Sequence, residues 1–165
     1  SLIRMSLIPS AFSARGSMVV PFGELNPFTI WFWFELESVP SGAEKQYIEE
    51  LFESWFFLGK LGSFNAENLQ VQDEGLDISY MRYDNDRESM MALMHNMGEI
   101  EYLGTLGRCW FDLGTSDAVA IDVLINGMQQ LSKDFVPIVR FTIGGEHPDW
   151  PIPEEQKPDD FAEFN

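Results

Sequence analysis

The stretch FTIWFWFELE, residues 28–37, decides the fold class of this chain. Its short run of β-branched and aromatic side chains predicts a buried β-strand. Ser41 and Glu44 follow at the spacing of a helix capping box, so we expect a helix from Ser41 to about Leu58. GKLG, residues 59–62, then predicts a corner that ends this helix. A phosphate-binding loop is disfavoured here. The Gly-Lys pair of such a loop follows a strand, whereas Gly59 and Lys60 follow a predicted helix.

The second half of the chain repeats this order of strand and helix. WFEL, residues 33–36, and WFDL, residues 110–113, each end a predicted strand before a serine-capped helix. We therefore predict an α+β fold with pseudo-duplicated β-α-β halves, in which an antiparallel sheet carries two main helices on one face as a ferredoxin-like sandwich. The other predicted segments are a hairpin, a short Met-rich helix stopped by Gly98, a second hairpin, a helix capped by Ser116 and a last strand, at residues 68–83, 89–97, 99–113, 117–133 and 136–143.

Two flanking segments differ in composition from the α+β domain predicted at residues 27–146. Residues 1–26 are predicted to form an extended N-terminal arm, and the absence of Asp and Glu from residues 1–23 is typical of an organelle transit peptide. Residues 147–165 form a Pro-rich, acidic tail, for which extended backbone is expected. We expect both segments to need a neighbouring molecule to hold one shape.

The charge of the chain restricts its partners. Asp and Glu outnumber Lys and Arg by 27 to 10, which gives a formal net charge of −17. This charge repels nucleic acid and anionic lipid surfaces, and it favours basic protein surfaces. No apolar run approaches the ~20 residues of a membrane-spanning helix, so we expect a protein that is soluble or peripheral to a membrane.

No group of residues predicts a catalytic, metal or cofactor site. Cys109 is the only cysteine, which excludes an internal disulfide, and we expect it to be a small buried hydrophobe. DNDRES, residues 84–89, begins like a calcium loop, but Ser89 and His95 stand where Gly and Glu are required. We therefore predict a structural role for His95 and no enzymatic activity. A small-ligand pocket near His95 and residues 59–62 remains an alternative.

Aromatic side chains supply the candidate partner contacts. Aromatic residues make up 14% of the 165 residues, with five Trp and fourteen Phe. We expect some of these rings to lie at the surface, because aromatic side chains are enriched in protein interfaces. The candidates are Trp55, Phe56, Phe57, Phe64, Trp150, Pro151, Phe161 and Phe164.

Four blocks of sequence carry a resemblance to a known family. SWFFLGKLGSFNAENLQVQ, LMHNMGE, RCWFDLGTSDA with DVLIN, and GGEHPDWP are similar to the domain-of-unknown-function family 3531, from about Trp31 to Pro151. The family occurs in cyanobacteria and plastids, so the resemblance implies an oxygenic photosynthetic setting. It implies no activity, cofactor or catalytic residue.

Two functions are consistent with these observations. The first is a non-enzymatic chloroplast protein that acts as an accessory subunit or assembly factor on the stromal side of a photosynthetic membrane complex, with photosystem I as the first expectation. Its partners would be protein subunits with a basic stromal surface, and its location the stroma or the stromal face of the thylakoid. The alternative is a stromal small-ligand-binding domain or an enzyme, with Asn65, Asn68 and Asn96 beside the pocket near His95.

Overall fold

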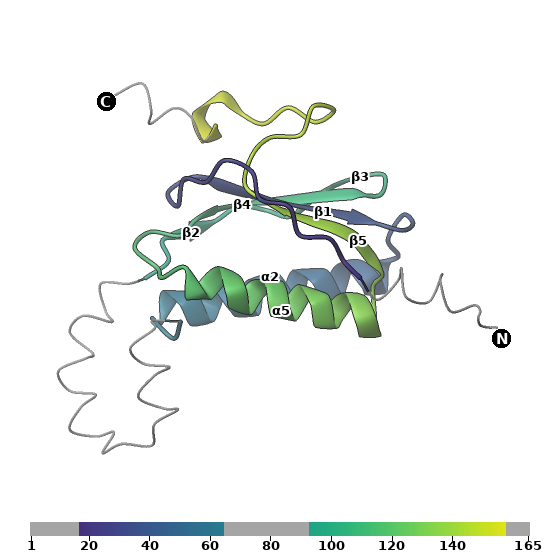
Figure 1. The fold of residues 1–165 in the computed structure, drawn as a ribbon, viewed down its shortest axis with the longest axis horizontal. Helices are drawn as coiled ribbons and strands as arrows, with labels where there is room; N and C mark the ends of the chain where they lie inside the picture. The colour runs from purple at the N-terminus through teal and green to yellow at the C-terminus, as the bar shows by residue number, and fades with distance from the viewer. Residues whose placement is uncertain (1–16, 65–92, 158–165) are drawn as a thin grey trace, which may run out of the picture.

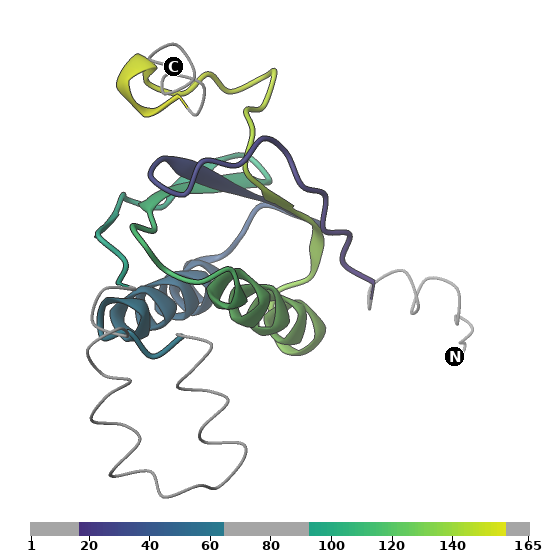
Figure 2. The same cartoon turned by 60° about the vertical axis from the view of Figure 1, so that its left-hand side comes forward.

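Two helices cover one face of a five-stranded antiparallel sheet, and the C-terminal segment crosses the other face (Figures 1 and 2). The computed structural model describes residues 17–64 and 93–157. Its elements are β1 (Ile30–Leu36), α2 (Gly42–Lys60), β2 (Asn96–Met97), β3 (Glu101–Leu103), β4 (Leu106–Asp112), α5 (Val119–Asp134), β5 (Ile138–Ile143) and the short helix η1 (Glu154–Gln156). The predicted hairpin at residues 68–83 and the calcium-like residues 84–89 lie outside the described residues.

The sheet has the order β2-β4-β1-β5, and β3 pairs with β4 on the same side as β2. The central strand is β1, which is antiparallel to both β4 and β5. The predicted α+β class, with two helices on one face of an antiparallel sheet, is therefore confirmed. The ferredoxin-like assignment and the duplication remain predictions.

The stretch that contains β1 is buried because both faces of the sheet are covered. Phe32 and Phe34 are fully buried in the core beneath the helices. Trp31 and Trp33 alternate with them and belong to a second apolar cluster on the outer face. Because successive side chains of a strand point to opposite faces, a strand covered on both sides shows an almost continuous apolar run. The prediction of a buried strand is confirmed.

The two ends of α2 are formed by the residues that the sequence indicated. The Ser41 side chain accepts a hydrogen bond from the backbone N–H of Glu44, and the Glu44 carboxylate accepts one from the N–H of Ser41. The helix ends at Lys60, and Gly62 has a φ of 76°, a left-handed conformation that suits glycine. Residues 59–62 therefore form a corner, as predicted.

Replacing Ser41 with alanine is expected to lower the free energy of unfolding by about 1 kcal/mol, because the first turn of α2 loses its side-chain acceptor. Ser54→Ala is the matched control, since Ser54 is exposed within the same helix. Urea denaturation followed by circular dichroism measures both variants. Equal midpoints for the two variants would contradict a stabilising role for the capping box.

Two sequence predictions about helices are wrong. Residues 93–97, the described part of the predicted Met-rich helix, are not helical, and Asn96–Met97 forms β2. Pairing with β4 outweighs helix propensity here, since Asn96 and Met97 lie opposite Asp112 and Phe111. Ser116 does not cap α5, which begins at Val119 without a side-chain cap. The hydroxyl of Ser116 is buried without a hydrogen-bond partner in the described part of the chain.

Strands β2 and β3 together form one edge of the sheet. β3 and β4 are joined by a two-residue turn at Gly104 and Thr105, where Gly104 has a φ of 62°, and this confirms the second predicted hairpin. The pairing of β3 with β4 is shifted by one residue relative to the pairing of β2 with β4. Residues 98–100 therefore contain one residue more than the facing part of β4, as in a β-bulge. Within the described ranges, β2 and β3 are paired on one side only.

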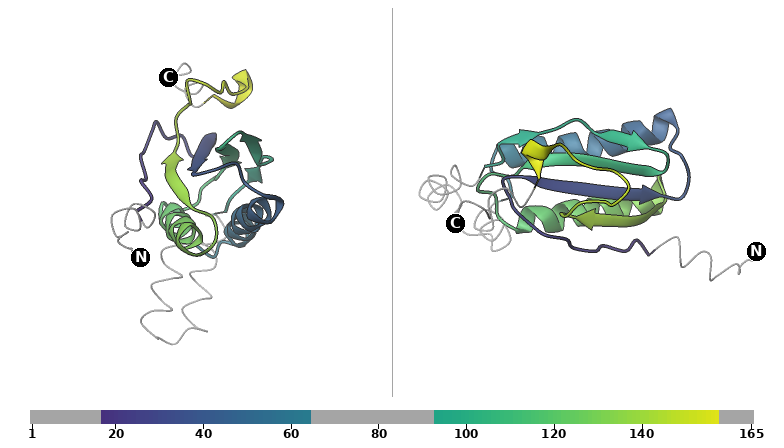
Figure 3. Two further views of the ribbon diagram at one scale, coloured as in Figure 1. Left: turned by 90° about the vertical axis from the view of Figure 1, so that its right-hand side faces the viewer. Right: turned by 90° about the horizontal axis from the view of Figure 1, so that it is seen from above.

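The described parts of the two flanking segments are held by the domain itself. Val19 and Phe22 form parallel bridges to Arg140 and Ile143, so the N-terminal arm lies beside β5 (Figure 3). The N–H of Ile143 donates to the carbonyl of Pro21, whose missing N–H is tolerated at a sheet edge. Residues 147–157 cross the outer face of the sheet. The expectation that a neighbouring molecule must hold these segments is therefore wrong for residues 17–26 and 147–157.

Candidate functional site

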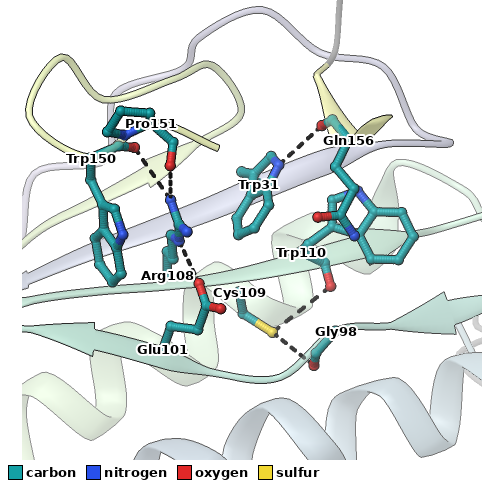
Figure 4. A network of polar contacts seen from close by, with 9 residues as sticks. All are labelled: Trp31, Gly98, Glu101, Arg108, Cys109, Trp110, Trp150, Pro151 and Gln156. Atoms are coloured by element: carbon teal, nitrogen blue, oxygen red, sulfur yellow. Dashed lines mark hydrogen bonds and ion pairs between the residues drawn. The ribbon is translucent and has the colours of Figure 1, made fainter. Parts of the chain in front are cut away.

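The outer face of the sheet is occupied by the C-terminal segment, which docks on tryptophan rings and one buried arginine (Figure 4). The Arg108 guanidinium carbon lies 4.1 Å from the ring centre of Trp150 and 4.7 Å from that of Trp31. Arg108 Nη1 donates to the carbonyls of Trp150, at 3.2 Å, and Pro151, at 2.9 Å. This buried side chain thus joins β4 to the segment through both stacking and hydrogen bonds.

The charge of Arg108 is balanced from the edge of the sheet. Its Nε lies 2.6 Å from a carboxylate oxygen of Glu101 on β3. Trp31 Nε1 donates to the carbonyl of Gln156 at 3.1 Å, so the segment is also fixed at its far end. Extended Pro-rich backbone is typically bound in this way, by aromatic side chains whose N–H groups donate to its carbonyls. The C-terminal segment therefore fills the outer face of the sheet. The one sign of this docking in the sequence is Arg108, a charged residue within a mostly apolar strand.

A groove on the opposite side of the edge strands remains open in the described structure. It has a volume of about 450 Å³ and lies between α2 and residues 97–100. We call it the acidic groove, because three carboxylates and three apolar side chains line it: Glu49, Glu53 and Glu99, with Phe56, Met97 and Ile100. The apolar side chains are partly buried and pack against the main core, so they form a fixed floor. The groove presents negative charge above an apolar surface.

The carboxylates of this region act on two neighbouring titratable groups. Burial raises the pKa of the Tyr102 hydroxyl, and the negative charge of Glu49 raises it further. Burial likewise raises the pKa of the Cys109 thiol, with smaller contributions from Glu101 and Glu53. Cys109 is thus a neutral, buried thiol, as expected, and both shifts have the sign that a local excess of negative charge produces.

The aromatic candidates on α2, and Phe64 just after it, have different environments. Trp55 is buried and donates its indole N–H to the carbonyl of Ala120 at 2.8 Å, so its ring belongs to the core. Phe64 stacks on Trp55 with ring centres 6.5 Å apart. Phe56 lines the acidic groove. Phe57 is 61% exposed, and it is the candidate of this group whose ring faces solvent in the described structure.

The two described candidates in the C-terminal segment, Trp150 and Pro151, make contacts within the chain. The ring of Trp150 stacks against the Arg108 guanidinium and meets the Trp33 ring edge to face. The carbonyl of Pro151 accepts a hydrogen bond from Arg108. Phe161 and Phe164 lie outside the described residues. Trp150 and Pro151 therefore serve the outer face of the domain itself.

The described polar residues considered for chemistry do not converge on one site, and Asn65 and Asn68 lie outside the described residues. His95 is half exposed, and its Nδ1 lies 3.5 Å from a carboxylate oxygen of Asp112. His95 and Asn96 do not line the acidic groove. In residues 17–64 and 93–157, no group of three or more His, Cys, Asp or Glu side chains is arranged to hold a metal ion. In the same residues, no helix is long and apolar enough to cross a membrane.

Comparison with known proteins identifies the family. Neither the curated proteins nor the solved structures contain a match to this chain. The family described as "Protein of unknown function (DUF3531)" matches residues 18–158, which include β1, both helices, the described N-terminal arm and the docked C-terminal segment. The match therefore extends beyond residues 31–151, where the sequence blocks indicated it. The chain belongs to the DUF3531 family.

Proposed function

We propose that this chain is a non-enzymatic chloroplast protein, located in the stroma or on the stromal face of the thylakoid. It acts there as a peripheral accessory subunit or assembly factor of a photosynthetic membrane complex, with photosystem I as the first candidate. The observation that carries the proposal is the acidic groove, where Glu49, Glu53 and Glu99 surround an apolar floor. A surface of this kind fits a basic protein partner.

The charge of the whole chain supports the same class of partner. A formal net charge of −17 attracts basic protein surfaces and accelerates their encounter at low ionic strength. The acidic groove adds a place where this attraction is combined with burial of apolar side chains. The described flanking segments pack on the domain, so the proposal rests on the groove and not on them.

The family supplies the biological setting of the proposal. Resemblance to the family implies cyanobacteria and plastids, and therefore oxygenic photosynthesis. The candidate partners in that setting are the photosynthetic complexes of the thylakoid membrane. A basic surface on the stromal side of one of them is the partner that this acidic domain would complement.

Fractionation of thylakoid membranes from the source organism tests this function. The chain is expected to migrate with a photosynthetic complex on native gels at low salt. It should be released by about 0.5 M NaCl, because salt at this level screens exposed charges within a few ångströms. The two fractions are compared by immunoblotting for the chain and for a photosystem I subunit. Migration only as a free monomer at low salt would exclude the proposed function.

The volume of the acidic groove favours one second candidate, a stromal small-ligand-binding domain or enzyme. About 450 Å³ falls within the range of small-molecule sites. The rim of three carboxylates would then select a cationic metabolite. Thermal-shift screening with polyamines and amino acid derivatives separates the two functions, since a stabilising metabolite combined with no complex formation would favour the second.

A further inference from the structure

We infer that the acidic groove binds a Lys- or Arg-bearing extended segment of a protein partner, which adds as a strand to the unpaired edge of β2 and β3. This inference rests on the proposed function and specifies the chemistry of its partner. Three features carry it: the carboxylates of the groove, its apolar floor and the sheet edge beside it.

The spacing of the carboxylates suits an extended basic segment. Glu49 and Glu53 are separated by four residues of α2, which corresponds to a rise of ~6 Å along the helix axis. Side chains at positions i and i+2 of a strand point to the same face and are ~6.7 Å apart. Alternate Lys or Arg residues of an added strand therefore match the interval between these two carboxylates. Glu99 lies on the opposite wall, next to the strand edge.

The floor of the groove accommodates the aliphatic part of such side chains. Phe56 comes from α2, while Met97 and Ile100 come from the edge segment, and all three are partly buried. Lys and Arg carry apolar stems that pack on surfaces of this kind while their charged ends reach carboxylates. Lys45, one turn before Glu49 on α2, shows a related arrangement, because its ammonium lies 4.8 Å from the ring centre of Tyr102.

The sheet edge supplies the backbone contacts. Within the described residues, β2 and β3 pair with β4 alone. The N–H of Met97 donates to the side-chain oxygen of Asn96 at 2.9 Å, so an added strand would pair with the other backbone groups along this edge. Addition of an extended peptide to such an edge is a common mode of recognition, with backbone hydrogen bonds for affinity and side-chain pockets for specificity. The carboxylate of Glu99 would repel an acidic strand and admit a basic one.

Charge excludes two other occupants. A second copy of the chain carries the same formal charge of −17, so pairing of two such edges is disfavoured. Residues 65–92 contain seven acidic and two basic residues, so they do not complement the groove. Residues 1–16 contain Arg4 and Arg15 and no acidic residue. The experiment must therefore distinguish binding of a partner in the groove from binding of this segment.

The first experiment measures binding of a fluorescent, capped peptide, Arg-Val-Lys-Val-Arg-Val, to the full chain by fluorescence anisotropy. We expect saturable binding that weakens as salt rises. The triple variant Glu49→Gln, Glu53→Gln and Glu99→Gln should bind about tenfold more weakly, because each exposed ion pair contributes a few-fold to affinity. A second peptide of the same sequence, with N-methyl groups on alternate peptide bonds, tests strand addition. We expect the chain not to bind this peptide, because the methyl groups block backbone hydrogen bonds.

A matched control removes the same amount of charge elsewhere. Glu50→Gln, Asp122→Asn and Glu146→Gln are exposed positions outside the groove, and this triple variant has the same net charge as the groove variant. We expect its affinity for the peptide to stay within about twofold of the original chain. Equal loss of affinity in both triple variants would overturn the groove as the binding site. Full binding by the N-methylated peptide would overturn strand addition.

A second comparison separates this inference from the proposed function and from occupation by the chain itself. If the groove variant still migrates with the photosynthetic complex as the control variant does, the proposed function stands and the inference is wrong. If neither chain associates with a complex, the proposed function fails, while specific peptide binding would still support a basic partner. A several-fold gain in peptide affinity on Arg4→Gln with Arg15→Gln would overturn the partner assignment and place residues 1–16 in the groove.

Discussion

Replacing Phe32 with alanine is expected to lower the free energy of unfolding by about 4 kcal/mol, because the change removes a fully buried ring and leaves a cavity. Phe32 lies at the centre of β1, and its ring contacts rings from both sheet and helix. The ring centres of Phe111 and Phe141 lie 5.3 and 5.8 Å away on the neighbouring strands, and that of Trp55 on α2 lies 5.9 Å away. One substitution therefore weakens several contacts between layers.

Phe57→Ala is the matched control for this experiment. Both changes remove a phenyl ring, but Phe57 is 61% exposed on α2, so its loss should change stability by no more than about 0.5 kcal/mol. Chemical denaturation followed by circular dichroism gives both free energies of unfolding. A domain of this size has about 5–15 kcal/mol in total, so the Phe32 variant should show a large shift in its midpoint. If the two variants lost similar free energies of unfolding, Phe32 of β1 would not lie at the centre of the core.

Replacing Arg108 with alanine is expected to cost about 3 kcal/mol and to release the C-terminal segment from the sheet. The guanidinium is buried, and its loss leaves Glu101 and the carbonyls of Trp150 and Pro151 without their donor. The cost comes mainly from the carbonyls of Trp150 and Pro151, which lose their donor, since the Glu101 side chain is 47% exposed and can bind water instead. Stacking on Trp31 and Trp150 is lost as well. Limited proteolysis should then cleave the chain after Gly145 much faster than in the original protein.

The control for Arg108 lies on β5, which is separated from β4 by β1. Arg140 pairs with Glu35, but its side chain is 46% exposed, compared with 7% for Arg108. Arg140→Ala should therefore cost less than about 1 kcal/mol and leave proteolysis of the C-terminal segment unchanged. Arg108→Lys keeps the charge but loses the planar, forked donor, so we expect an intermediate effect. If Arg108→Ala leaves the segment protected, the tryptophan rings alone hold it.

Local sequence determined the elements whose signals are complete within a few residues. The apolar run at residues 28–37, the capping pair Ser41 and Glu44 and the corner at residues 59–62 all appear in the structure as expected. Each depends on backbone conformation and on contacts between near neighbours, which a short window of sequence contains. The hairpin at Gly104 belongs to the same class, because its turn sets the register of both strands.

Tertiary pairing decided the places where the sequence interpretation is wrong. The Met-rich residues before Gly98 have good helix propensity, but Asn96 and Met97 pair with β4 instead. Met94 is buried against Gly59, at the end of α2. Neither partner is near in sequence, so no local pattern could indicate them. The start of α5 has no side-chain cap, because the N–H groups of Ala120 and Ile121 donate to the backbone carbonyls of Asp117 and Ala118 instead.

The surfaces of the molecule depended most on the tertiary structure. Composition alone determined that the chain is strongly acidic and rich in aromatic side chains. Only the fold brings Glu49 and Glu53 of α2 to face Glu99 of the sheet edge, and only the fold places Trp150 on Arg108. The physical reason is that a groove or a docked segment arises from side chains far apart in sequence, whose approach is set by packing of the layers and not by local propensity.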